Sequence, residues 1–164
     1  MAGLSPTDEA TVTAQLGRSP RDALAVAYRC PCGRPAAVTT SPRLGAGTPF
    51  PTTFYLTCPS AVARCSRLEA NGVMTEMTRR LRTDPELAAR YRAAHRDYLS
   101  RRTRLGDVPE IAEVSAGGMP DRVKCLHALV GHALAAGPGV NPLGDEALAE
   151  IGAFWESPCL AAER

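Results

Sequence analysis

Residues 123–132, Val-Lys-Cys-Leu-His-Ala-Leu-Val-Gly-His, constrain the fold more than any other stretch of the chain. Their apolar character predicts a buried helix over residues 120–136. A core helix ordinarily carries aliphatic side chains, whereas this one carries a thiol at Cys125 and imidazoles at His127 and His132. We therefore expect this helix to be central and to face a functional site.

Helix geometry limits what these three side chains can do together. Cys125 and His132 share one face but lie about 10 Å apart along the axis, so they do not suit one metal ion. His127 diverges by about 200° from Cys125 and by about 140° from His132. We expect Cys125 to be the metal ligand. His127 and His132 remain candidates for catalysis or proton transfer, and the alternative for each is a hydrogen-bonded core or interface residue.

Other cysteines follow strands that a fold can bring to this helix. Cys30 and Cys32 form a Cys-x-Cys turn, which is tighter than the usual zinc knuckle, and Cys58 ends a strand and precedes a helix. We predict that Cys30, Cys58 and Cys125 converge on a zinc ion or an iron–sulfur cluster. Cys159 becomes a fourth thiolate if the tail returns to the core, and Cys32 is a further candidate. Three ligands leave a position open for Lewis-acid chemistry, and four close the site.

Length and composition bound the class of protein. The 164 residues predict one domain over residues 1–164, with a ragged N-terminus (1–5) and a C-terminal tail (153–164). A net charge of +2 does not favour nucleic acid as a partner. No targeting segment and no apolar run of about 18–20 residues is visible, so we expect a cytoplasmic protein without a membrane span. In that reducing compartment, the six cysteines favour free thiols or metal ligands over disulfides.

Local patterns predict an α+β fold. Strands are expected over residues 22–29, 36–40 and 52–57. Helices are expected over residues 6–16, 59–70, 73–81, 85–104 and 146–151, besides the central one. We expect a small antiparallel sheet of about three strands near the N-terminus, packed on four or five helices.

The loop before the predicted central helix is a candidate anion site. Gly117 and Gly118 precede the expected helix start, and Arg122 is nearby. Free backbone N–H groups at a helix N-terminus favour negative charge. The segment is not a phosphate-binding P-loop, because that motif's pattern of glycines, lysine and serine or threonine is absent. The alternative to an anion site is an ordinary glycine loop.

Six segments of the chain, taken in order, resemble domain-of-unknown-function family 501, a bacterial family, as actinobacteria carry it. They are Arg29–Pro31, Pro49–Thr52, Tyr55–Pro59, Ser66–Glu69, Val123–His127 and Asn141–Gly144. The resemblance runs from about Thr7 to Cys159. It implies that the residues important to the family include Cys30, Cys58, Cys125, His127 and His132. Cys32 and Cys65 look like departures from the family pattern.

Three functions remain open from the sequence. The first is a protein with a cysteine-ligated metal or iron–sulfur site. The second is a thiol enzyme or redox sensor without metal, with Cys58 or Cys125 as nucleophile and His127 or His132 as base. The third is a non-enzymatic interaction or regulatory module with a protein partner. The resemblance links this module to cell division or phosphate metabolism, because genes of the family often neighbour those for a septum-formation initiator and an exopolyphosphatase.

Overall fold

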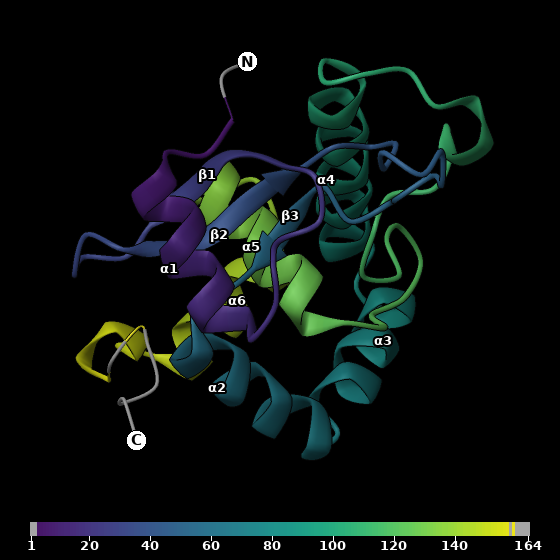
Figure 1. The fold of residues 1–164 in the computed structure, drawn as a ribbon. Helices are drawn as coiled ribbons and strands as arrows, with labels where there is room; N and C mark the ends of the chain where they lie inside the picture. Colours follow the sequence, from purple (N-terminus) through teal and green to yellow (C-terminus); the bar gives the residue numbers. More distant parts are fainter. Residues whose placement is uncertain (1–2, 158, 160–164) are drawn as a thin grey trace.

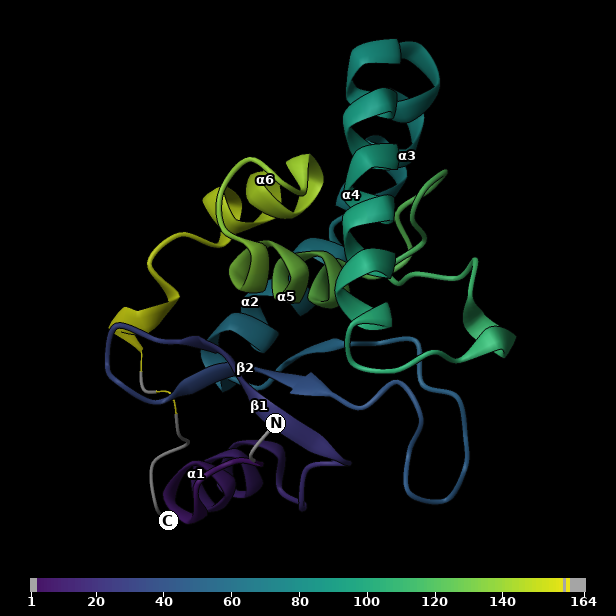
Figure 2. The ribbon, with the colours of Figure 1, turned by 90° about the horizontal axis from the view of Figure 1, so that it is seen from above.

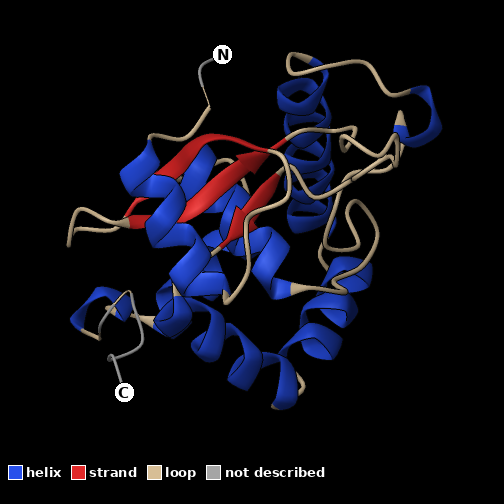
Figure 3. Cartoon of the chain, viewed as in Figure 1, coloured by secondary structure: helices blue, strands red, loops and turns tan. Residues whose placement is uncertain are grey.

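A three-stranded antiparallel sheet and a set of helices make up the computed structural model, which describes residues 3–157 and 159 (Figures 1 and 3). The strands lie in the order β1 (Ala23–Arg29), β2 (Pro35–Thr40) and β3 (Phe54–Leu56). The helices in the described residues are α1 (Pro6–Leu16), α2 (Pro59–Ala70), α3 (Val73–Thr83), α4 (Pro85–Thr103), α5 (Leu126–Ala136) and α6 (Pro142–Ile151), with single 3-10 turns at Pro109–Ile111 and Phe154–Glu156. The predicted α+β class is confirmed. Residues 1–2, 158 and 160–164, which include parts of the two predicted ragged ends, lie outside this description.

The sheet lies between helices on its two faces (Figure 2). Helix α1 packs on one face against β2, and α5 crosses the other face in contact with all three strands. Helices α2 and α6 pack in turn on α5. The central strand β2 is buried at every position, which explains why small apolar residues and threonines fill it instead of an alternating pattern.

Helix α5 begins at Leu126, later than the predicted start at residue 120. The chain before it is held in turns, because the Lys124 N–H donates to the carbonyl of Gly117 (2.7 Å). The first N–H of the helix then donates to the carboxylate of Glu69 on α2 (2.9 Å). A side chain from another helix therefore fixes this boundary, and local sequence does not reveal it.

Helix α6 begins at Pro142, before its predicted start at residue 146. Pro142 occupies the first helical position, and the Asn141 side chain accepts a hydrogen bond from the Gly144 N–H (2.9 Å). The same residues form a turn signal in the sequence, so the pattern was compatible with both structures. Across the helices of the described part of the chain, none has the length and apolar character needed to cross a bilayer.

Candidate metal centre

The hairpin turn between β1 and β2 carries two of the predicted metal ligands. The Cys30 N–H donates to the Arg34 carbonyl (2.9 Å), and the Gly33 N–H donates to the Cys30 carbonyl (2.8 Å). Gly33 has φ 91°, a conformation that suits glycine. Backbone N–H groups of Cys32 and Arg34 also hydrogen-bond to the sulfurs of Cys30 and Cys32. This tight turn holds the two thiols close together.

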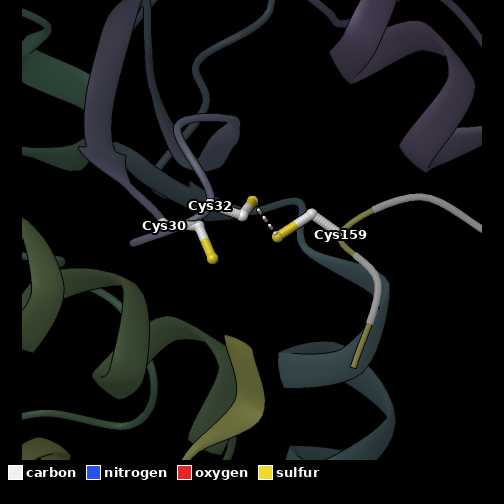
Figure 4. A group of neighbouring side chains, drawn as sticks. All are labelled: Cys30, Cys32 and Cys159. Carbon is white, nitrogen blue, oxygen red and sulfur yellow. Dashed lines mark hydrogen bonds between the residues drawn. The ribbon is translucent and has the colours of Figure 1, made fainter. Parts of the chain in front are cut away.

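Cys159 reaches the same place from the other end of the chain (Figure 4). The Gln15 side chain on α1 donates to the carbonyls of Pro35 (2.8 Å) and Cys159 (2.9 Å) through its amide nitrogen. Cys159 Sγ lies 3.1 Å from Cys32 Sγ. The sulfurs of Cys30, Cys32 and Cys159 all lie within 4.8 Å of one another. The expectation that Cys159 joins Cys30 if the tail returns therefore matches the geometry.

Cys58 supplies a fourth thiol from the start of α2. Its N–H donates to the carbonyl of Ala36 (3.2 Å), which fixes the strand end beside the hairpin. Its sulfur lies 3.8 Å from Cys159 Sγ, and its side chain is fully buried. We call Cys30, Cys32, Cys58 and Cys159 the four-thiol cluster.

Burial sets the electrostatics of this cluster. Loss of hydration raises the pKa values of the buried thiols Cys30 and Cys159. Burial acts the same way on the more exposed Cys32, but hydrogen bonds from Cys159, the Arg34 N–H and Cys30 outweigh it and lower the pKa of Cys32. Several thiolates close together repel one another, so a bound cation is the ordinary means of stabilising them.

The structure places Cys125 away from the four-thiol cluster, which corrects the predicted grouping of Cys125 with Cys30 and Cys58. Cys125 lies beside Glu69 and His127, near the last turn of α2. Glu69 follows Cys58 by eleven residues on this helix, about 16 Å along its axis. The length of α2 therefore keeps the two sulfurs apart.

Glu69, Cys125 and His127 form a second cluster, which we call the α5 cluster. His127 Nδ1 lies 3.1 Å from Glu69 Oε1 and 4.0 Å from Cys125 Sγ. Hydrogen bonding to Cys125, aided by the Glu69 charge, raises the pKa of His127 to about 9. Burial opposes ionisation of Cys125, but hydrogen bonds from His127 and the Ala128 N–H outweigh it and lower its pKa. Sequence reasoning missed Glu69, although it belongs to a segment that carries the family resemblance.

His132, the other catalytic candidate, is fully buried and serves as a link between helices. Its Nε2 lies 2.8 Å from Asp97 Oδ2 on α4, and its Nδ1 lies 3.1 Å from Asn141 Nδ2 before α6. The ring is stacked on Phe54 and meets Tyr98 edge-on. Burial lowers the pKa of His132 against the opposing effect of Asp97. This arrangement matches the hydrogen-bonded core histidine that was the alternative to a catalytic role.

The predicted anion site at Gly117, Gly118 and Arg122 loses its physical basis. These residues do line a cavity of about 440 Å³. However, α5 begins at Leu126, and the Arg122 N–H already donates to the Gly118 carbonyl (3.1 Å). The helix N-terminus that would attract an anion is therefore not at these glycines.

Comparison with known proteins gives one match. No curated protein and no solved structure matches this chain. A family model described as "Protein of unknown function (DUF501)" matches residues 26–149, a range that contains Cys30, Cys32, Cys58 and the whole α5 cluster. The match covers most of the chain and confirms the family resemblance seen in the sequence segments. The chain therefore belongs to the DUF501 family.

Proposed function

We propose that this protein binds one zinc ion through Cys30, Cys32, Cys58 and Cys159, as a structural centre of a cytoplasmic protein. The observation that carries the proposal is the meeting of four thiols from three separate parts of the chain. Isolated buried cysteines are common as small apolar residues. Here three sulfurs lie within 4.8 Å of one another and the fourth, of Cys58, lies 3.8 Å from Cys159, which matches the ligand set of structural zinc sites.

The sulfur separations favour zinc over a four-iron cluster. Zinc–sulfur bonds of about 2.3 Å in a tetrahedron put neighbouring sulfurs about 3.8 Å apart. The separation between Cys58 and Cys159 is 3.8 Å, that between Cys32 and Cys159 is 3.1 Å and would have to widen, and Cys30, Cys32 and Cys159 lie within 4.8 Å of one another. A four-iron cluster places its metal atoms between the thiolates and needs a wider cage.

Four protein ligands leave no position for a substrate, so the proposed role is structural. The ion would hold the β1–β2 turn, the start of α2 and the residue-159 segment together. Such a site contributes its binding free energy directly to folding. The α5 cluster and the cavities next to it remain free for other chemistry.

Elemental analysis of the full chain, purified anaerobically under reducing conditions, tests this proposal. We expect zinc to be bound, and Cys30→Ser and Cys58→Ser to lose the ion of this centre. Cys65→Ser is the matched control, because Cys65 is a buried thiol of α2 outside the four-thiol cluster. It should keep the metal content of the wild type.

Three results would contradict the proposal. A brown protein that contains iron and sulfide would show that the site holds an iron–sulfur cluster and not zinc. A Cys32–Cys159 disulfide in freshly reduced protein would show that these thiols pair with each other instead of binding a metal. Unchanged zinc content in both Cys30→Ser and Cys58→Ser would exclude this cluster as the binding site.

A further inference from the structure

We infer that the α5 cluster is a second zinc site, in which Glu69, Cys125 and His127 are the protein ligands and one coordination position faces an apolar cavity. This site is independent of the four-thiol cluster. Its ligand set of one carboxylate, one thiolate and one imidazole is drawn from the groups that zinc prefers.

The orientation of the His127 ring is the first argument. Its Nε2 lies 3.2 Å from the carbonyl oxygen of Val62, which can only accept a hydrogen bond. The proton of the neutral ring therefore belongs on Nε2, and Nδ1 carries a lone pair. That lone pair points toward the Glu69 carboxylate and the Cys125 sulfur. Without a metal, a protonated His127 ring supplies the positive charge between Glu69 and Cys125, and a zinc ion would take its place by displacing the Nδ1 proton.

Interatomic distances agree with a tetrahedral ion at that point. Zinc bonds of about 2.0–2.3 Å separate a nitrogen and an oxygen ligand by about 3.4 Å, and a nitrogen and a sulfur ligand by about 3.6 Å. The corresponding separations from His127 Nδ1 are 3.1 Å to Glu69 Oε1 and 4.0 Å to Cys125 Sγ. Thus shifts of a few tenths of an ångström are enough to bring the ligands onto one ion.

Each ligand is oriented by a second hydrogen bond. Glu69 uses its other oxygen, Oε2, to accept from the Leu126 N–H (2.9 Å), and His127 uses Nε2 toward Val62. Hydrogen bonding of this kind to a backbone group is the usual support of a metal-binding histidine. The side chains of His127 and Glu69 are 26% and 22% exposed, so an ion can reach them from solvent.

The surroundings indicate what else could bind the ion. Cys125 and His127 line a cavity of about 400 Å³ whose other walls are mostly apolar, including Phe54, Leu56 and Val62. Three protein ligands leave a fourth position for water, as in catalytic zinc sites. The thiolate and the carboxylate together balance the charge of the ion. The site therefore suits a small, mainly apolar molecule with one oxygen or nitrogen donor.

Zinc stoichiometry in the full chain tests this inference. We expect two zinc ions in the wild type and one in Cys125→Ser, with much weaker binding of the second ion in Glu69→Gln. Ser66→Ala is the matched control, because Ser66 contacts only the outer nitrogen of His127 (3.2 Å) and should keep both ions. Replacement of zinc by cobalt distinguishes the two sites. In the double variant Cys30→Ser, Cys58→Ser, the remaining cobalt should be bound at the α5 cluster and show the charge-transfer band of a single cobalt–sulfur bond.

A second measurement serves if a variant fails to fold. In wild-type protein stripped of metal, added zinc should slow alkylation of Cys125 at least tenfold, as read by peptide mass spectrometry. Two results would overturn the second site and leave the four-thiol centre standing. One is that zinc does not protect Cys125; the other is that the wild type binds one zinc ion and Cys125→Ser still binds it. If the wild type binds one zinc ion, and that ion is lost in Cys125→Ser but kept in Cys30→Ser, the second site is supported and the four-thiol centre is overturned.

Discussion

Cys32 Sγ and Cys159 Sγ lie 3.1 Å apart although 127 residues separate them in the chain. The hydrogen bonds of Gln15 to Pro35 and Cys159 bring the two segments together, so α1 takes part in positioning the thiols. A metal bound there would connect segments that are distant in sequence, and a metal that closes so long a loop contributes most to the stability of the folded state.

Removal of zinc should lower the thermal stability of the wild type. An ion present at about a thousand times its Kd stabilises the folded state by about 4 kcal/mol, which corresponds to about 10 °C in Tm for a chain of this size. Differential scanning calorimetry with and without a strong chelator measures the shift. Cys159→Ser should show a lower Tm and a smaller chelator response than the wild type, because the chelator can then remove only the ion of the α5 cluster. Cys65→Ala should respond as the wild type does. Equal chelator responses in all three proteins would contradict the structural role.

Replacement of His132 by phenylalanine should destabilise the fold by about 2–4 kcal/mol. The variant removes the nitrogen acceptor of the buried Asn141 side-chain amide and a hydrogen bond to Asp97, while ring size is roughly preserved. Urea denaturation gives the free energy of unfolding. His95→Ala is the comparison, because His95 is partly exposed and makes one hydrogen bond, to Ser115 (2.7 Å). A cost no larger than that of His95→Ala would show that the buried network contributes little.

The cost of His132→Phe should also depend on pH. Burial lowers the pKa of His132 below its unfolded value of about 6.5. Asp97 and Asp145 oppose this effect because they favour the charged ring, whereas Arg101 adds to it because it disfavours the charged ring. Between the two pKa values the unfolded state binds more protons, so wild-type stability falls as pH falls through this window. The variant lacks this loss, and the difference between the two proteins should shrink below about pH 6.5. A difference that stays constant from pH 8 to about pH 5 would be inconsistent with a neutral buried His132.

Gly131→Ala should destabilise the protein by about 1–3 kcal/mol, even though alanine favours helices. A Cβ atom at this position would lie 2.6 Å from the Phe54 carbonyl oxygen, so α5 would have to move away from β3. Urea denaturation at neutral pH tests this. Gly106→Ala, whose Cβ would meet only the Pro42 ring at 3.4 Å, should change stability by less than about 0.5 kcal/mol. Similar values for the two variants would mean that the α5–β3 contact adjusts freely.

Local signals were sufficient for most of the secondary structure. Ser5, Pro6 and Gly17 bound α1 as expected, because a helix cap, a proline at the first position and a left-handed glycine act within a few residues. The Cys30–Cys32 turn is local in the same sense. The start of α5 was missed, because its cap is the carboxylate of Glu69 from another helix.

The sequence by itself determined the α+β class, the family and the presence of thiols at turns and strand ends. Tertiary structure alone decided which thiols meet: Cys159 joins Cys30, Cys32 and Cys58, while Cys125 pairs with His127 and Glu69. The physical reason is that ligand grouping depends on distances across the fold. These distances are set by the length of α2 and by contacts such as that between Gln15 and Cys159, which no spacing along the chain encodes.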